Sequence, residues 1–393
     1  MTVAVEFRNV DIVFGKDRAR AREMIDRGAS RDEVLARTGA VLGCAGASLT
    51  VQEGDISVLM GLSGSGKSTL LRAVNRLNVV SRGSVMVHDG DRMVDVVTCD
   101  DATLRRLRQK QVAMVFQQFG LLPWRTVEEN VGFGLELAGV PDAERRERVA
   151  NQLRLVGLDQ WSKKYAHELS GGMQQRVGLA RAFATEAPIL LMDEPFSALD
   201  PLIRTKLQDE LLQLQAKLKK TIIFVSHDLE EALKIGTTIT IMEGGRIVQT
   251  GTPEDIVLQP ANDYVRDFIA NVNPLSVLTA WNVMRMKHEL AHDADGWVWL
   301  DRRATTRFML DAQDLVIAAE RGGQPADWVS CNDVERLPEN GSQVFWATPG
   351  TSLKTVMLAM QRSQTAPVAL FDEQSRFVGS IGIQDVLSAV LRR

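Results

Sequence analysis

Short apolar runs alternate with helical patterns along the first two thirds of the chain. Apolar positions alternate over residues 3–14 and predict a strand, and residues 51–59 predict a second one. The runs Ile189–Met192 and Ile222–Val225 are of the kind that parallel sheets bury on both faces. Helical patterns come between and after these runs, over residues 69–77, 173–185, 203–219 and 230–235. This alternation predicts the α/β fold class for this part of the chain.

A charged segment interrupts the pattern soon after the first predicted strand. Residues 16–39 predict two short helices that are separated at Gly28. Ser30 and Glu33 have the spacing of a capping box, which predicts the start of the second helix, and Gly39 predicts its end. We therefore expect a helical insert over residues 16–39.

The character of the sequence changes near residues 273–280. Residues 351–390 predict a helix, two strands and a second helix, over residues 352–363, 366–371, 377–383 and 385–391. Tryptophans become frequent here, at Trp281, Trp297, Trp299, Trp328 and Trp346. We therefore expect a domain over residues 1–272 and a smaller α+β domain over residues 273–393.

Composition and charge narrow the class of protein. Of the 393 residues, 45% are apolar and 24% are charged, which is typical of a folded soluble protein. The net charge of −4 provides no global attraction to nucleic acid. No apolar run approaches the roughly 20 residues that a membrane span needs, so a role in transport would require separate membrane subunits. The cysteines Cys44, Cys99 and Cys331 fit neither a disulfide framework nor a zinc site, which favours reduced cytosolic thiols.

One glycine-rich loop carries the chemistry of phosphate binding. Residues Gly61–Ser68 match the pattern G-x-x-x-x-G-K-S, between a predicted strand and a predicted helix. The backbone N–H groups of such a loop wrap phosphates, and the helix N-terminus adds partial positive charge. Lys67 is predicted to reach the β- and γ-phosphates of ATP, and Ser68 to bind Mg²⁺. The predicted nucleotide-binding residues here are Gly61, Ser63, Gly64, Ser65, Gly66, Lys67, Ser68 and Thr69.

Two adjacent acids follow the apolar run Ile189–Met192. Asp193 and Glu194 are predicted at the carboxyl end of a buried strand, where ligands collect in open α/β sheets. We expect Asp193 to hold Mg²⁺ and Glu194 to polarise the water that attacks the γ-phosphate. The alternative, two solvated acids in a turn, is disfavoured by the apolar run before them.

A second candidate anion site lies at Leu169–Met173, just before a predicted helix. Ser170, Gly171 and Gly172 would present a hydroxyl group and bare amides at the helix start. One ATP rarely needs two such sites from one chain. The economical arrangement is therefore two copies head to tail, each closing this loop over the nucleotide of the other. A helix cap without a ligand is the alternative.

Together these motifs resemble the nucleotide-binding subunits of ABC transporters. The resemblance rests on the Walker A loop Gly61–Ser68, the Q-loop Gln117, the signature Leu169–Met173, the Walker B run Ile189–Glu194, the D-loop Ser197–Asp200 and the switch His227. It implies that Gln117 senses Mg²⁺ and the attacking water, that His227 contacts the γ-phosphate, and that Asp200 lies at the nucleotide site. It also implies a helical subdomain over residues 118–185. In that family an aromatic residue near the N-terminus stacks on adenine, which points to Phe14; a core position is the alternative.

Three further features resemble one branch of that family, the glycine betaine, proline and choline importers, and the choline importers most of all. These features are the insert over residues 16–39, the run Met60–Thr69 and the run Ala198–Arg204. The resemblance implies ATP and Mg²⁺ as cofactors, a homodimer, integral membrane permease subunits and a periplasmic or lipid-anchored substrate-binding protein. It implies a peripheral location at the cytoplasmic face of the inner membrane and no nucleic acid partner. The segment Phe119–Val127 would line the groove that receives a permease helix, with a buried loop as the alternative.

A different functional class shares the same motifs. Soluble ABC ATPases act on nucleic acid or ribosomes, but they usually carry long coiled-coil insertions or two ATPase halves in one chain. Neither feature is present in this sequence.

The second domain resembles a CBS module over residues 351–390. Its first half, residues 281–340, is expected to be a degenerate partner in which Trp297–Leu300 is the one clear strand. In the family such modules regulate transport, some by binding adenine nucleotides and some by sensing ionic conditions. A purely structural or dimerising role is the alternative.

One further motif is expected to have no function. Residues His288–His292 match H-E-x-x-H, in which two histidines on one helix face bind zinc and Glu289 would act as base. No convincing third ligand follows, so we expect a solvated helix face.

Overall fold

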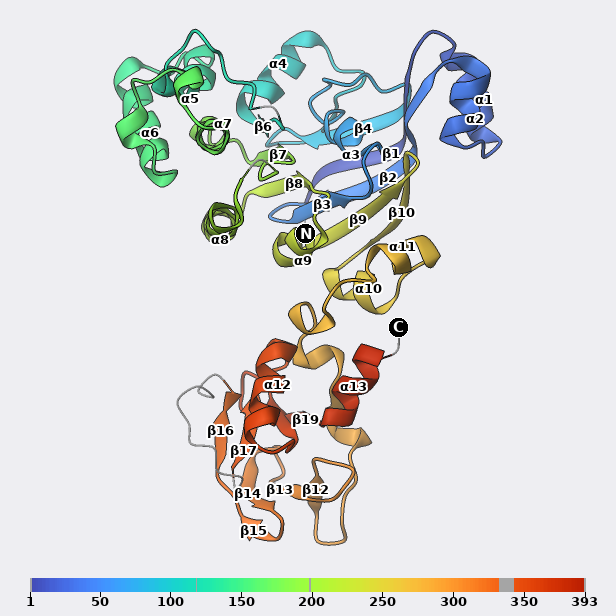
Figure 1. Cartoon of the computed structure of the whole chain (residues 1–393), viewed down its shortest axis with the longest axis vertical. Helices are drawn as coiled ribbons and strands as arrows, with labels where there is room; N and C mark the ends of the chain where they lie inside the picture. The colour runs from blue at the N-terminus through green and yellow to red at the C-terminus, as the bar shows by residue number, and fades with distance from the viewer. Residues whose placement is uncertain (1, 118, 198, 332–342, 392–393) are drawn as a thin grey trace. The chain divides into compact units, whose positions relative to one another are not determined.

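The computed structural model describes residues 2–117, 119–197, 199–331 and 343–391 (Figure 1). These residues form two compact units, unit 1 over Met1–Ala270 and unit 2 over Asn271–Arg393. The division lies close to the predicted boundary after residue 272. Among the described residues, none of the helices combines the length and the apolar character that a membrane crossing requires.

The central sheet of unit 1 has six strands in the order β10-β9-β3-β8-β7-β6. The strands are β3 Ile56–Met60, β6 Val112–Val115, β7 Ile189–Asp193, β8 Thr221–Val225, β9 Thr238–Glu243 and β10 Arg246–Gly251. All neighbours are parallel except β10, which runs antiparallel to β9. Every residue of β3, β7 and β8 is buried, which explains their uninterrupted apolar runs. The predicted α/β fold with a parallel sheet is confirmed.

A second, antiparallel sheet covers the first and has the strand order β2-β1-β4-β5. Its strands are β1 Val3–Phe14, β2 Val41–Gln52, β4 Arg82–His88 and β5 Met93–Asp95. Side chains of both sheets share one hydrophobic core, which includes Phe7, Leu59 and Val225. The predicted strand over residues 3–14 is confirmed.

Two predictions on the approach to and exit from the glycine loop were wrong. Residues 51–59 are not one strand, because the chain leaves β2 at Gln52, turns through Gly54 with φ 81°, and enters β3 at Ile56. The predicted helix over residues 69–77 is shorter, α3 Lys67–Leu71. Beyond it the N–H groups of Leu77 and Asn78 both donate to the carbonyl of Arg72, which closes a turn in place of further helix.

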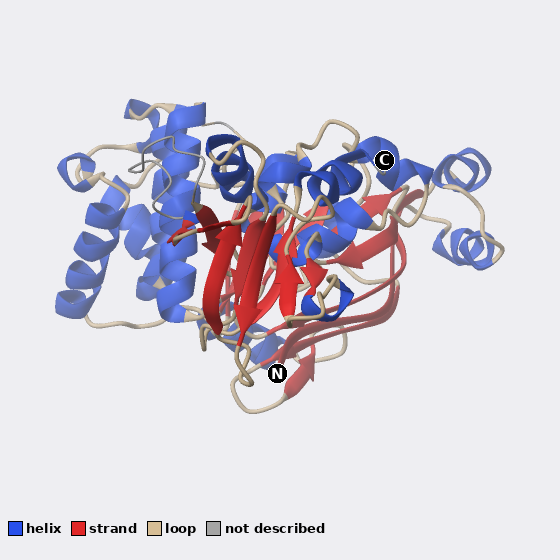
Figure 2. Ribbon diagram, turned by 90° about the horizontal axis from the view of Figure 1, so that it is seen from below, coloured by secondary structure: helices blue, strands red, loops and turns tan. Residues whose placement is uncertain are grey.

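Helices flank the strands in Figure 2. In unit 1, α4 Asp101–Lys110 contacts β6, α9 Leu229–Ile235 contacts β3, and α10 Pro253–Leu258 contacts β9 and β10. Unit 1 also contains α8 Pro201–Leu218 and α11 Asp263–Phe268. The helices predicted over residues 203–219 and 230–235 are confirmed as α8 and α9.

Three helices form a separate bundle at one end of unit 1 (Figure 1). They are α5 Val127–Leu137, α6 Asp142–Leu155 and α7 Gly171–Ala184, and they enclose a core of their own around Val131, Leu153 and Val177. The helix predicted over residues 173–185 is confirmed as α7. The bundle occupies the chain between the strands β6 and β7, where the sequence predicted a helical subdomain.

The insert lies at the opposite end of unit 1 (Figure 1). It consists of α1 Arg18–Asp26 and α2 Arg31–Thr38, as predicted. The capping box is present, because the Glu33 carboxylate accepts from the Ser30 N–H at 2.8 Å and Ser30 Oγ accepts from the Glu33 N–H at 3.3 Å. Gly39 ends α2 with φ 64°.

The described part of unit 2 contains two sheets and two amphipathic α-helices. A five-stranded sheet has the order β11-β19-β18-β17-β16, and a four-stranded antiparallel sheet has the order β12-β13-β14-β15. The strands of the first are β11 Arg285–Met286, β16 Trp328–Ser330, β17 Val344–Ala347, β18 Val368–Phe371 and β19 Phe377–Ile381. Those of the second are β12 Trp297–Trp299, β13 Thr306–Leu310, β14 Val316–Arg321 and β15 Gln324–Pro325.

The second half of unit 2 has the predicted order of elements. Helix α12 Leu353–Arg362, strands β18 and β19, and helix α13 Ile383–Leu391 follow one another as the pattern indicated. The prediction of one clear strand in the first half was wrong, because β12 is one of several strands and opens an antiparallel meander. That this half is a degenerate CBS partner stays a prediction. Short, partly exposed strands such as β14 and β15 carry too weak an alternation to be read from the sequence.

Candidate nucleotide-binding site

The glycine loop joins the buried end of β3 to the start of α3. Gly61 and Gly66 have φ values of 141° and 100°, which glycine adopts readily and other residues do not. A Cβ atom on Gly61 would overlap the carbonyl oxygen of Met242, and one on Gly66 would overlap that of Gly43. The backbone conformation and the neighbouring carbonyl oxygens therefore permit only glycine at these two positions.

Lys67 lies inside this loop and is only 5% exposed. Its Nζ donates to the carbonyl oxygens of Gly61 at 2.8 Å and Leu62 at 3.0 Å. Burial lowers the pKa of Lys67, whereas the nearby carboxylates of Glu194 and Asp193 act to raise it. The loop thus surrounds a buried ammonium group, which suits the binding of an anion.

A second polar group of the loop also fits a phosphate ligand. Ser65 is buried, and its Oγ has no hydrogen-bond partner within the described part of the chain. An unsatisfied buried hydroxyl costs free energy unless a ligand or water completes it. The loop therefore offers both a cation and an unused donor to an oxyanion.

Asp193 is the buried carboxylate beside the loop, with an exposed fraction of 0%. Ser68 Oγ donates to its Oδ1 at 2.6 Å, and Arg72 donates to its Oδ2 from Nε at 3.0 Å and Nη2 at 2.8 Å. The structure thus brings together Ser68 and Asp193, two of the three residues that the sequence proposed for Mg²⁺, whereas the third, Gln117, contacts Glu194. A hydroxyl and a carboxylate are the hard oxygen donors that this cation prefers, so the residues present fit it.

Sequence reasoning missed the role of Arg72. Arg72 is the C-cap of α3, four positions after Ser68, and its helical backbone conformation keeps both side chains on one face. Both reach the same carboxylate, so the i, i+4 spacing is the signal that predicts the contact. Arg72 supplies the charge that keeps a fully desolvated Asp193 compensated in the nucleotide-free chain.

Glu194 directly follows Asp193 and is the meeting point of two other predicted residues. Gln117 Nε2 donates to its Oε2 at 3.2 Å, and His227 Nδ1 lies 3.1 Å from the same oxygen. Its backbone has φ 47°, in the left-handed region that costs a residue with a Cβ about 1–2 kcal/mol. Such strain is concentrated at functional sites, where the surrounding structure holds it in place.

The loop that carries His227 is fixed on both sides of the histidine. Ser226 Oγ donates to the buried carboxylate of Glu231 at 2.5 Å, and burial raises the pKa of Glu231. Asp228 accepts from the N–H of Glu231 and caps α9, while Arg204 of α8 pairs with Asp228 at 3.2 Å. The switch histidine is therefore the exposed member of an otherwise anchored turn.

Phe14 ends β1 close to the start of α3. A Cβ on Gly43 would lie 2.8 Å from both the Phe14 ring and the methyl group of Thr69, so the two side chains flank the same point of β2. Phe14 is 39% exposed, and the alternative of a core position is therefore wrong. Its role in adenine stacking stays a prediction.

The signature residues lie apart from this loop within one chain. Ser170 caps α7 by accepting from the N–H of Met173 at 3.4 Å, and it is exposed together with Gly171. Gly172 packs near Leu199, and Asp200 caps α8. Across the described residues, no hydrogen bond or ion pair joins Ser170 to Gly61–Ser68. Ala198 of the D-loop lies outside the described residues.

The motif His288–His292 does not lie on an α-helix, contrary to expectation. His288 belongs to the 3-10 turn Lys287–Glu289, and His292 pairs through its backbone with Val298. The expected helix face is therefore wrong, although both histidines are exposed as expected. Within the described ranges, no group of three or more His, Cys, Asp or Glu side chains has the arrangement of a metal site.

Comparison with known proteins places this geometry in a family. A family model described as ABC transporter matches residues 44–197. The chain is 52% identical over 285 residues to the glycine betaine/proline betaine transport system ATP-binding protein ProV of Escherichia coli, covering 72% of this chain and 70% of that protein. It is 40% identical over 386 residues to the glycine betaine transport ATP-binding protein OpuAA of Bacillus subtilis, covering 96% and 90%.

The chain belongs to the ABC transporter ATP-binding subunits of the glycine betaine, proline and choline transport family. It is an ATP-binding transport ATPase, and the relatives lend no support to the alternative of an ABC ATPase that acts on nucleic acid or ribosomes. Among solved structures, it is similar to the dimeric bacterial ABC transporter cassette MJ0796. That likeness has a TM-score of 0.55 and 29% identity, over 63% of this chain and 98% of the cassette.

Replacing Arg72 by methionine tests how Asp193 is neutralised in this ABC ATPase. Without nucleotide, we expect the free energy of unfolding to fall by about 1–3 kcal/mol, because a buried carboxylate loses its charged partner. With saturating Mg-ATP the difference should shrink, since a bound cation supplies opposing charge. Denaturant unfolding with and without Mg-ATP measures both, with Arg105→Met at an exposed position of α4 as the control. If Arg72→Met lowered the free energy of unfolding by the same amount with and without Mg-ATP, this account would be contradicted.

Proposed function

We propose that this chain hydrolyses ATP to drive import of a quaternary amine, such as glycine betaine or choline, through separate membrane subunits. The observation that carries the hydrolytic part is the convergence of Gln117 and His227 on one oxygen of Glu194, beside the buried Lys67. The substrate class rests on the relatives, whose names specify glycine betaine and proline betaine. Nothing in an ATPase subunit itself contacts the transported molecule.

The residues of the site divide between binding and hydrolysis. Lys67 and the loop N–H groups bind the β- and γ-phosphates, and Phe14 stacks on adenine. Glu194 accepts a proton from the attacking water, while Gln117 and His227 orient its carboxylate and the γ-phosphate. Ser68, Asp193 and Gln117 would hold Mg²⁺. A magnesium ion bound there supplies positive charge that offsets the charge of the phosphates.

Two copies complete each nucleotide site. At the start of α7, Ser170 and Gly171 are exposed and Gly172 is half-buried, and among the described residues no hydrogen bond or ion pair joins Ser170 to the Gly61–Ser68 loop. Leu62 in the loop is 62% exposed and Leu202 after the D-loop is 84% exposed, and a dimer interface would remove both from water. The MJ0796 cassette is itself dimeric. These observations support a head-to-tail homodimer in which the signature of one copy covers the ATP of the other.

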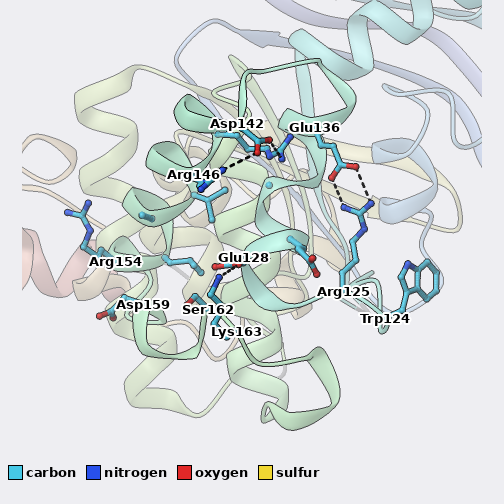
Figure 3. Close-up of a pocket in the computed structure, with 16 residues that line it drawn as sticks. Trp124, Arg125, Glu128, Glu136, Asp142, Arg146, Arg154, Asp159, Ser162 and Lys163 are labelled. Atoms are coloured by element: carbon cyan, nitrogen blue, oxygen red, sulfur yellow. Dashed lines mark hydrogen bonds and ion pairs between the residues drawn. The ribbon is translucent and has the colours of Figure 1, made fainter.

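A groove in the helical bundle suits a permease helix. A cavity of about 820 Å³ lies between α5, α6 and the segment that follows the Q-loop (Figure 3). Its wall combines apolar Val149 and Leu153 with ion pairs, such as Arg125 with Glu136 at 2.6 Å. Trp124 at its margin is 71% exposed. An amphipathic helix can bury its apolar face in such a groove and pair its ends with the charged margin.

The remaining partners follow from this arrangement. The permease subunits are integral membrane proteins, and a periplasmic or lipid-anchored binding protein delivers the substrate to them. The ATPase is then peripheral, at the cytoplasmic face of the inner membrane. Unit 2 regulates transport, and the CBS-like order of its second half supports this assignment.

Reconstitution tests the transport function. The chain, its permease subunits and the binding protein are placed in lipid vesicles that contain ATP. We expect glycine betaine or choline, presented by the binding protein, to raise both ATP turnover and uptake of the amine. A sugar or a neutral amino acid serves as the control ligand. Failure to co-purify with an integral membrane protein, or turnover that no quaternary amine changes, would refute this function.

Replacing Glu194 by glutamine tests the general base. We expect ATP binding to persist while turnover falls by about 10²–10⁴-fold, because the amide cannot accept the proton of the attacking water. Size measurements with Mg-ATP should then show a dimer that holds its nucleotide. Glu147→Gln, at an exposed position on α6, should behave like the unmodified chain. Hydrolysis at the normal rate would remove Glu194 from this role.

Replacing Ser170 by arginine tests the shared site. The substitution removes the Ser170 hydroxyl, and the larger arginine side chain blocks the helix start. Hydrolysis should therefore be lost, while each chain still binds ATP at its own Gly61–Ser68 loop. Asn151→Arg on the exposed face of α6 is the matched control. Turnover that survives in the Ser170 variant would mean that one chain completes the reaction alone.

A further inference from the structure

The helical insert is held firmly against the rest of unit 1. Ala21, Ile25 and Val34 of α1 and α2 are buried in a small core that they share with the strands β1 and β2. Arg82 donates to both carboxylate oxygens of Asp26 at 3.0 and 2.6 Å. The same guanidinium donates from Nε to the fully buried Asp11 at 2.6 Å. The insert is therefore a fixed element, and side chains that project from it have defined positions.

One of these side chains reaches the nucleotide loop. Arg31, the first residue of α2, donates from Nη1 to the carbonyl oxygen of Gly64. A Cβ built on Gly64 would lie 3.3 Å from the same Nη1 atom, which shows how closely the guanidinium approaches the loop. Arg31 lies outside all the motifs that identify the ATPase, and it belongs to the helical insert over residues 16–39.

The position of Arg31 runs against local helix preference. A cation at the start of a helix faces the positive end of the helix dipole, an arrangement that is unfavourable by about 0.3–1 kcal/mol. The two residues that follow, Asp32 and Glu33, have the preferred negative charge. A residue that violates a local rule inside an otherwise well-formed helix indicates a role beyond helix stability. The acceptor at Gly64 provides that role.

The peptide between Gly64 and Ser65 is held at both ends. Its carbonyl accepts from Arg31, and its N–H donates to the carbonyl of Leu62 at 3.1 Å. The next carbonyl, that of Ser65, accepts from the N–H of Gly245 at 3.1 Å. Carbonyl oxygens that faced a phosphate would repel it, so donors outside the loop that hold them favour a loop shape that accepts anions.

We propose that Arg31 is a positioning residue for ATP binding, through which the insert sets the affinity of the glycine loop for nucleotide. The guanidinium fixes the Gly64–Ser65 peptide, and the anchored insert fixes the guanidinium. The inference rests on ATP binding by the Gly61–Ser68 loop and adds to it a residue from a separate segment of the chain. Because Arg31 acts through the loop, its loss changes binding of ATP and leaves the hydrolytic groups in place.

Arg31→Ala and Arg31→Lys in the full-length chain test this proposal. The dissociation constant of a fluorescent ATP analogue and the KM for ATP should rise about tenfold in Arg31→Ala, the effect of losing one hydrogen bond from a charged donor. The turnover number at saturating ATP should stay within about twofold of the original. Arg31→Lys keeps a cationic donor and should recover part of the affinity. Arg20→Ala, on the exposed side of α1, is the matched control and should bind as the original chain does.

Other outcomes separate the proposal from simpler accounts. An unchanged KM in Arg31→Ala would overturn it, and so would an equal rise in Arg20→Ala, which would reflect only the loss of positive charge. Circular dichroism and the melting temperature identify a misfolded variant. If Arg31→Ala is misfolded, the KM for ATP of the folded Arg31→Lys decides, and a value equal to that of the original chain would count against the proposal. An original chain that does not bind the analogue would refute the ATPase function itself, whereas an original chain that binds it beside an equally tight Arg31→Ala refutes only this inference.

Discussion

The structure depends on where two adjacent carboxylates are placed at the edge of a buried sheet. Asp193 is the last residue of β7 and stays fully buried. The left-handed backbone of Glu194 then directs the next carboxylate toward a different set of partners. Arg72 and Ser68 compensate Asp193, while Gln117 and His227 meet Glu194. Four elements of unit 1 are thereby brought to one point, because parallel strands present their carboxyl ends at the same edge.

The same arrangement prepares the site for exchange of partners. Without nucleotide, Lys67 donates to carbonyl oxygens of its own loop and Ser68 to Asp193, so the buried polar groups are compensated. A bound ATP would offer Lys67 charged phosphate oxygens in place of neutral carbonyl oxygens, and hydrogen bonds to charged acceptors are stronger. In the proposed function, nucleotide binding would therefore replace interactions that Lys67 already makes within its own loop. Ser65 is the exception, since its buried hydroxyl has no partner among the described residues until a ligand arrives.

Much of this site can be predicted from the sequence, because its strands and loops have recognisable local sequence patterns. The all-apolar runs of β3, β7 and β8 predict buried parallel strands, and the residues after them must then meet at one edge. What the sequence did not reveal depends on contacts between distant segments. α3 stops at Leu71 because later N–H groups turn back to Arg72, and Arg72 faces Asp193 only because α3 packs beside β7. The weak strands of unit 2 are likewise stabilised by neighbours and not by their own pattern.

Two segments of this ATPase, the signature and the helical insert, differ in where their contacts are made. One chain supplies the loop, the carboxylates and the switch histidine, yet its signature residues form an exposed helix start with only a cap bond of their own. Since no hydrogen bond or ion pair joins Ser170 to the Gly61–Ser68 loop among the described residues, the signature fits the proposed dimer, in which it would cover the ATP of a second copy. The insert differs from the signature, because its Arg31 contacts the Gly61–Ser68 loop of the same chain, and the Arg82–Asp26 ion pair holds the insert in place. The two proposals thus assign nucleotide affinity to contacts within one protomer and completion of the reaction to contacts between two.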